Sequence, residues 1–238
     1  MDTKYASTTT GVDARARQEA STIFLAKVFN WMAAGLALTG IVAWFAATSG
    51  LTLSIARSPL YIFLILAELG MVFYLAARVE KMKAATATAL FIGYAALNGI
   101  TLSVIFLRYT GTSIAGTFMI TAGMFGAMAV YGMVTKRDLS GLGSFLFMGL
   151  IGLILASVVN MFLGSSTLHL AISAVGVLVF VGLTAYDVQR VKTMGEQGIM
   201  AQGEDVVQKG AIIGALALYL DFINLFWMLL TFFGGGRD

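Results

Sequence analysis

Seven long apolar runs constrain this chain of 238 residues more than any other feature of its sequence. Charged residues, glycines or polar turns bound the runs, which cover residues 28–48, 59–77, 84–107, 113–135, 142–163, 170–186 and 210–233. A helix needs about 20 apolar residues to cross the hydrocarbon core of a bilayer. In lipid the backbone must satisfy its own hydrogen bonds, which favours helices over the short alternating strands of a barrel. The sequence therefore predicts an all-α membrane protein with seven transmembrane helices.

The polar segments divide the chain into three parts. We expect a cytoplasmic N-terminal tail over residues 1–22, a transmembrane domain over residues 23–233, and a short C-terminal tail over residues 234–238 on the outer side. The longest polar stretch inside the domain covers residues 188–209 and is predicted to be a loop between the sixth and seventh spans.

Small residues recur at close spacing inside the spans, where they let neighbouring helices approach each other. The residues expected in such contacts are Ala95, Gly99 and Ser103 in the third span, Gly116, Gly123 and Gly126 in the fourth, and Gly210 and Gly214 in the seventh.

The placement of lysine and arginine predicts the orientation in the membrane. Seven crossings put all but three of the 15 basic residues on one side, the exceptions being Arg57, Arg108 and Arg237. Cytoplasmic loops carry such an excess of lysine and arginine. We therefore expect the N-terminus in the cytoplasm and the C-terminus outside.

Composition excludes several classes of function. Charged residues make up 11% of the chain, against about 25% in a soluble domain, and a net charge of +3 cannot form a nucleic-acid-binding face. The absence of cysteine and the single histidine, His169, exclude thiolate and multi-histidine metal sites. The chain also lacks the G-x-x-x-x-G-K-[ST] phosphate loop. We expect no cofactor and no enzymatic activity.

Three carboxyl groups lie inside or at the end of a span: Glu68, Asp187 and Asp221. Asp221 is near the middle of its span, where a charge costs roughly 2.5–3.5 kcal/mol on insertion scales. It must be protonated, paired or in contact with water. It could hold two helices together, or it could bind protons or cations, which we favour because asparagine or serine would make a helix contact at lower cost. Asn224 follows Asp221 by three residues, on the same helix face, and could hydrogen-bond it.

Glu68 and Asp187 allow the same two interpretations. Glu68 lies near the middle of the second span, whereas Asp187 lies at the end of the sixth, where a carboxylate can simply meet water.

Three segments of the chain resemble one known family. They are YGMVTKRDLSGLGS at Tyr131–Ser144, GLTAYDVQR at Gly182–Arg190 and LYLDFINLF at Leu218–Phe226. Together they resemble the bacterial branch of the Bax inhibitor-1 family, the transmembrane Bax-inhibitor-motif proteins. The resemblance covers about residues 23–233, and the pairing of the two aspartate motifs is specific to the family.

The resemblance implies a fold and a set of functional residues. The fold would place six helices around the last one, in the bacterial inner membrane. Asp187 and Asp221 would form a pH-sensing pair that controls a slow calcium leak. A basic residue at the end of the second helix would bond one aspartate in the closed form, and Arg78 is the nearest candidate here. Glu68 would lie on the ion path.

The chemistry of carboxyl groups agrees with these expectations. Two carboxylates in a low-dielectric bundle cannot easily both ionise, so Asp187 and Asp221 would share a proton. Calcium takes 6–8 oxygen ligands, and the three scattered carboxyl groups supply few of them. We therefore predict a pH-sensitive calcium or cation leak in which Asp187 and Asp221 bind calcium weakly and transiently, with Asn224 and Glu68 on the path.

Three other functions stay open at this point. Some bacterial members of the family that it resembles are partners of a membrane-anchored protease, so the chain could be a regulator that binds such a protease or another membrane partner. Its N-terminal tail or the 188–209 loop would then carry the function. It could be a proton-coupled transporter of a solute. Asp187 and Asp221 could also form the two-carboxylate site of an aspartyl protease.

Overall fold

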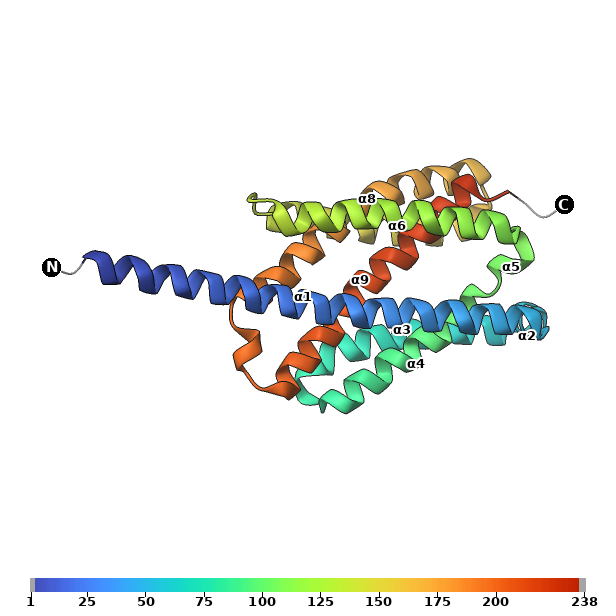
Figure 1. Ribbon diagram of the computed structural model, residues 1–238. Coiled ribbons are helices and arrows are strands. Elements are labelled where there is room, and N and C mark those ends of the chain that lie inside the picture. The colour runs from blue at the N-terminus through green and yellow to red at the C-terminus, as the bar shows by residue number, and fades with distance from the viewer. Residues whose placement is uncertain (1–2, 236–238) are drawn as a thin grey trace.

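The computed structural model describes residues 3–235, and all regular elements of that part are helical (Figure 1). The long helices are α1 (Thr3–Thr48), α3 (Leu60–Arg78), α4 (Ala84–Leu102), α6 (Gly111–Val134), α7 (Ser140–Leu163), α8 (Ser166–Glu196) and α9 (Glu204–Phe233). The short ones are α2 (Leu51–Ala56), η1 (Val79–Lys81), α5 (Ile105–Arg108) and η2 (Ile199–Ala201). Within residues 3–235, seven helices are long and apolar enough to cross a membrane, which confirms the predicted fold class.

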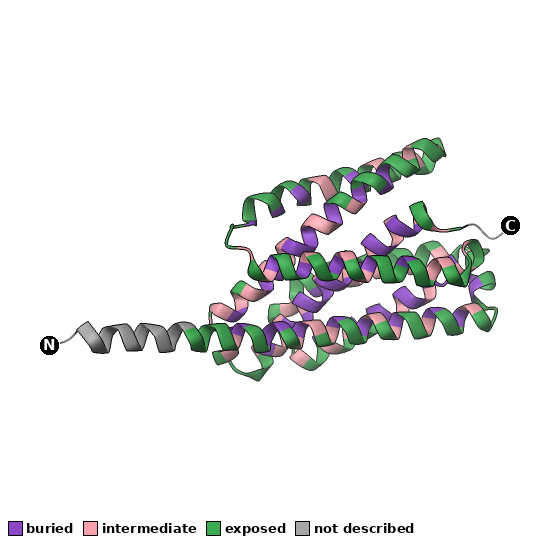
Figure 2. Ribbon diagram, turned by 45° about the horizontal axis from the view of Figure 1, so that its top comes forward, coloured by how far each residue is buried: buried purple, intermediate pink, exposed green. Residues whose placement is uncertain are grey.

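Helix α9 lies at the centre of the bundle and packs on α1, α4, α6 and α8. In Figure 1 it crosses between a group formed by α6 and α8 and a group formed by α1, α3 and α4. Burial concentrates along α9 and is sparse on the outer helices (Figure 2). Helix α3 packs on α4, and α7 packs on α8. The last span is therefore central, as the family resemblance implies.

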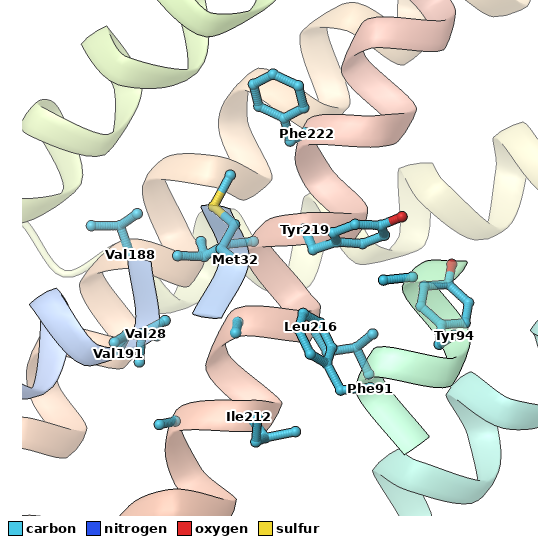
Figure 3. Close-up of a cluster of buried hydrophobic side chains, with 14 of the residues drawn as sticks. Val28, Met32, Phe91, Tyr94, Val188, Val191, Ile212, Leu216, Tyr219 and Phe222 are labelled. Atoms are coloured by element: carbon cyan, nitrogen blue, oxygen red, sulfur yellow. The ribbon is translucent and has the colours of Figure 1, made fainter. Parts of the chain in front are cut away.

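Apolar side chains of α1, α4 and α8 pack around the first half of α9 (Figure 3). Tyr219 is fully buried there, with its ring edge-on to Phe91 and to Tyr94 of α4, at centroid distances of 6.0 and 5.7 Å. The other labelled members of this cluster are Val28, Met32, Val188, Val191, Ile212, Leu216 and Phe222. Edge-to-face aromatic pairs of this kind fix ring orientation as well as contact area.

Glycines allow the closest helix contacts. A Cβ atom added to Gly99 would lie 2.7 Å from the carbonyl oxygen of Thr39, so α4 meets α1 backbone to backbone at this point. A Cβ atom on Gly132 would collide with the carbonyl oxygen of Ala185, which brings α6 equally close to α8. Gly214 lies close to side chains instead: a Cβ atom there would be 3.1 Å from Val191 and 3.2 Å from Val28. The small residues predicted in the third and seventh spans thus make tight helix contacts.

The corresponding prediction for Gly116, Gly123 and Gly126 is wrong. A Cβ atom on any of the three would meet nothing within 4 Å. The buried face of α6 is instead the ladder Thr117, Thr121, Phe125, Ala129 and Gly132. This ladder repeats every three or four residues, so it occupies one side of the helix, and the three glycines fall on the other.

The predicted 188–209 loop is mostly helical. Helix α8 continues to Glu196 because Val188, Val191 and Gly195 are buried on one face of the added turns. The connection to α9 then needs only a short turn, in which Gly198 and Gly203 adopt left-handed φ angles of 84° and 91°. Glycine tolerates such angles because it has no Cβ atom.

Two other boundaries differ from the prediction. The expected N-terminal tail is helical from Thr3, as part of α1. The expected third span is interrupted between α4 and α5, where the hydroxyl of Ser103 donates to the carbonyl of Ile100 and accepts from Thr52. Serine hydroxyls often divert helix backbone in this way. Residues 236–238 of the predicted C-terminal tail lie outside the described residues.

We expect the exchange Gly132→Ala to destabilise the protein by about 1–3 kcal/mol, because the added methyl group overpacks the α6–α8 contact. The matched exchange Gly126→Ala, on the open side of the same helix, should leave stability unchanged or raise it slightly. Thermal unfolding in detergent checks both variants. Equal melting temperatures for the two variants would contradict the packing described here.

Candidate functional site

The candidate site is a cavity of about 790 Å³ lined by five helices: α3, α4, α7, α8 and α9. All three membrane-embedded carboxyl groups, Glu68, Asp187 and Asp221, line it, and we call it the acidic cavity. Its walls also include apolar side chains of α3 and α7, the two outer helices. A space of this size with few polar groups and mostly apolar walls is typical of a binding site.

One face of α9 forms the floor of the acidic cavity. Ala217, Leu220, Asp221 and Asn224 follow one another at the spacing of a single helix face and all line the cavity. The amide of Asn224 donates to the carbonyl of Leu220, at 2.8 Å. The hydrogen bond considered between Asn224 and Asp221 is therefore replaced by a bond to the backbone.

Asp187 and Asp221 meet inside the bundle. Their carboxyl groups lie within hydrogen-bonding reach of each other. Asp221 is only 4% exposed, and in the described part of the chain its Oδ2 atom accepts no hydrogen bond from an amide, hydroxyl or guanidinium group. Ionised carboxylates are acceptors only, so two of them can bond only when one carries a proton. The geometry thus favours one proton shared between Asp187 and Asp221.

The basic residue beside this pair is Arg190, one turn after Asp187 on α8 and also on the cavity wall. Arg78 ends α3 as an exposed residue. Within residues 15–235, its side chain has no ion pair or hydrogen bond to either aspartate. The contact between Arg78 and Asp187 therefore stays a prediction, whereas Arg190 is in place in this structure.

Tyr186 and Arg190 also line a second hollow, of about 620 Å³, between the α6–α7 connection and the end of α8. Gln189 of α8 makes two hydrogen bonds to the α6–α7 connection. Its side chain donates to the Arg137 carbonyl and accepts from the Leu139 amide, both at 2.8 Å. The charged residues that line the second hollow are mostly basic: Lys136, Arg137, Arg190 and Lys192, with Asp138 and Glu196. The acidic cavity and the second hollow thus adjoin at two side chains of α8.

Glu68 lies on the opposite wall and is held by two donors from α4. The hydroxyl of Thr101 donates to its Oε1 atom at 2.6 Å, and the amide of Asn98 donates to its Oε2 atom at 3.2 Å. Hydrogen bonds to a carboxylate are stronger than those between neutral groups. Both donors therefore stabilise Glu68 in its ionised form.

No group of three or more histidine, cysteine, aspartate or glutamate residues could hold a metal ion within the described residues. Glu68 and the aspartate pair share the acidic cavity without forming one ligand cluster. A calcium ion bound there would need water or other oxygen atoms for most of its 6–8 ligands. The proposal of weak calcium binding at Asp187 and Asp221 thus concerns two ligands, not a cage.

Sequence reasoning identified all three carboxyl groups but missed the residues that position them. Asn98 and Thr101 are three residues apart in an apolar span, a spacing that indicates one polar face. Arg190 entered the orientation argument and ends the first aspartate motif, and its position three residues after Asp187 was the available signal. Tyr219 lies in the second aspartate motif but could not be identified from the sequence. In an apolar span, a tyrosine that makes a buried hydrogen bond occupies the same kind of position as a phenylalanine that only packs.

Comparison with known proteins identifies the relatives of this chain. A family model described as "Inhibitor of apoptosis-promoting Bax1" matches residues 22–238. The chain belongs to the Bax inhibitor-1 family. Inner membrane protein YbhL of Escherichia coli is 53% identical over 216 residues, which are 90% of this chain and 92% of the relative. An uncharacterized protein of Deinococcus radiodurans is 46% identical over 218 residues, 90% and 91% of the two chains.

Membership of the Bax inhibitor-1 family agrees with the seven apolar helices, so this is a membrane protein with an inner-membrane relative. An uncharacterized protein of Borreliella burgdorferi, 45% identical over 90% of this chain and 93% of its own, extends the similarity to another bacterium. The name of the Escherichia coli relative specifies a membrane, and none of the three names specifies an ion or a partner.

Single cysteines can test whether water enters the acidic cavity, because the chain has no cysteine of its own. We expect Asn224→Cys, which lines the cavity, to react with a small charged thiol reagent at least about tenfold faster than Leu225→Cys, because the reacting thiolate needs water. Leu225 is the adjacent, fully buried residue. Reaction rates are measured on folded protein in liposomes, and equal rates would contradict a wet cavity.

Proposed function

We propose that this Bax inhibitor-1 family member is a pH-sensitive cation leak in which Asp187 and Asp221 form the gate. The observation that carries the proposal is the buried Asp187–Asp221 contact at the wall of a cavity that also contains Glu68. A hydrogen bond that only holds two helices together would not need two carboxyl groups, since neutral side chains make such contacts without the cost of a buried charge.

The shared proton supplies the pH dependence. While one proton bridges Asp187 and Asp221, the pair has a single negative charge and joins α8 to α9. Loss of that proton leaves two like charges in a medium of low dielectric constant, which repel each other. Gain of a second proton removes the charge altogether. Either change alters the contact between the central helix and its neighbour.

A cation would compete with this proton. Because metal ions bind the deprotonated form of a carboxyl group, calcium affinity should rise with pH and calcium binding should release protons. Glu68, whose two donors favour its carboxylate form, would provide a second negative group on the opposite wall. Because the cavity offers few protein ligands and mostly apolar walls, we expect calcium to bind weakly. Weak binding suits a protein that lets calcium leak slowly better than one that stores it.

The route out of the acidic cavity would pass Tyr186 and Arg190, which also line the second hollow. Arg190 places a positive charge between the carboxyl groups and the basic end of the bundle. A cation passing there meets an electrostatic barrier, which agrees with a slow leak.

Calcium flux into dye-loaded liposomes tests the gate. We expect the flux of wild-type protein to differ several-fold between pH 6 and pH 8, and that of Asp221→Asn to be the same at both, because one carboxyl group cannot share a proton with an amide in the same way. The control Glu204→Gln, at an exposed position in the first turn of the same helix, should keep the wild-type profile.

Two outcomes of the flux experiment would contradict the proposal. An Asp221→Asn variant with the wild-type pH profile would remove the aspartate pair from the mechanism. Flux no greater than that of empty liposomes at both pH values would remove the leak itself and would favour a protein regulator.

A further inference from the structure

Four helices of the bundle are connected by a chain of buried hydrogen bonds that ends at Glu68. The amide of Asn98 donates to Glu68, and the hydroxyl of Tyr219 donates to Oδ1 of Asn98 at 2.9 Å. The hydroxyl of Thr39 lies 2.7 Å from that of Tyr219. This series of hydrogen bonds therefore runs from α3 through α4 and α9 to α1. Asn98 is 9% exposed, Thr39 1% and Tyr219 0%, so each polar atom must find its partner within the protein.

We propose that Tyr219 and Asn98 are positioning residues that hold Glu68 as an anionic group in the acidic cavity. Asn98 can turn either its NH₂ group or its oxygen toward Glu68, and only the NH₂ group stabilises a carboxylate. The hydroxyl of Tyr219 decides between the two orientations, because it supplies the donor that Oδ1 of Asn98 needs when the NH₂ group faces Glu68.

Thr39 leaves Tyr219 free to act as this donor. The Thr39 hydroxyl lies 2.8 Å from the carbonyl oxygen of Ala95 and 2.9 Å from that of Gly35, and both oxygens can only accept. The single proton of Thr39 is therefore used by a backbone carbonyl. The proton of Tyr219 then goes to Asn98, which also polarises the amide toward Glu68.

The opposite orientation of Asn98 requires a proton on Glu68. With its oxygen toward the carboxyl group, Asn98 can accept only from a protonated Glu68, because two facing oxygens without a proton repel. Its NH₂ group would then donate to Tyr219, whose proton would turn to Thr39. The orientation of two buried side chains on α4 and α9 thus depends on the charge of Glu68 on α3.

Tyr219 also brings these hydrogen bonds close to the aspartate pair along the backbone, because it precedes Asp221 by two residues on α9. The two side chains leave the central helix in different directions, one toward α4 and α1 and the other toward α8. Among the described residues, the other titratable groups around Glu68 are Tyr61 on its own helix, Tyr94 on α4, and Tyr186, Asp187, Arg190 and Asp221 across the cavity.

This assignment rests on the proposed leak, in which Glu68 is the carboxyl group opposite the aspartate pair. Its test, however, does not depend on flux. Infrared spectroscopy of the protein in liposomes records the carboxyl C=O band of a protonated side chain as pH is varied. The part of the band that disappears in Glu68→Gln belongs to Glu68. Its midpoint reports the proton directly, whether or not the protein conducts calcium.

We expect Tyr219→Phe to move this midpoint by about one pH unit in the alkaline direction, the size of one ordinary hydrogen bond. If wild-type Glu68 shows no protonated band at any pH tested, the band must appear in Tyr219→Phe. Phenylalanine keeps the ring contacts with Phe91 and Tyr94, so the variant loses only the hydroxyl. Tyr74→Phe, at an exposed tyrosine of α3, is the matched control and should leave the midpoint unchanged.

Asn98→Ala distinguishes a positioning role from a general effect of the tyrosine. It should shift the midpoint at least as far as Tyr219→Phe, and the double variant should shift it no further than Asn98→Ala alone, because Tyr219 acts through Asn98. Additive shifts, or a Tyr219→Phe midpoint equal to that of wild type, would overturn the assignment. A Glu68 band that persists in wild type at every pH would also overturn it.

Discussion

The structure depends on one constraint: three of its carboxyl groups lie within the membrane-spanning helices, where lipid does not hydrate them. A charge in the hydrocarbon region costs several kcal/mol unless it is paired, protonated or in contact with water. The chain meets this cost in two ways. Glu68 takes donors from Asn98 and Thr101, and Asp221 shares its buried site with a second carboxyl group, Asp187. The donors of the first arrangement favour an anion, whereas a hydrogen bond between the two carboxyl groups of the second requires a proton.

The packing of α9 brings both arrangements into one cavity. The central helix presents Tyr219 to α1 and α4, and Asp221 to α8, so the two polar systems lie on different sides of the same backbone. Close glycine contacts at Gly99 and Gly132 fix the helices that hold their partners. The outer helices α3 and α7 are less constrained, since each packs mainly on one neighbour.

The sequence predicted the seven spans and the three carboxyl groups because both follow from the cost of polarity in lipid. It was less successful where a helix continues beyond the membrane or breaks within it. Hydropathy alone ended the sixth span at Tyr186, but the buried stripe of Val188 and Val191 extends α8 to Glu196. Glycine spacing alone could not distinguish Gly132, which faces a backbone carbonyl, from Gly126, which faces open space. The partners of Glu68 depend on how α3 is rotated against α4, and no pattern within a single span contains that information.

The central claim, that Asp187 and Asp221 share one proton in competition with a cation, is tested most directly by counting protons. Calorimetry of calcium binding in buffers of different ionisation enthalpy gives the number of protons released for each ion bound. The account predicts release of up to about one proton by wild-type protein near neutral pH and none by Asp221→Asn. Calcium binding to wild-type protein without proton release, or with the same release in both proteins, would contradict it.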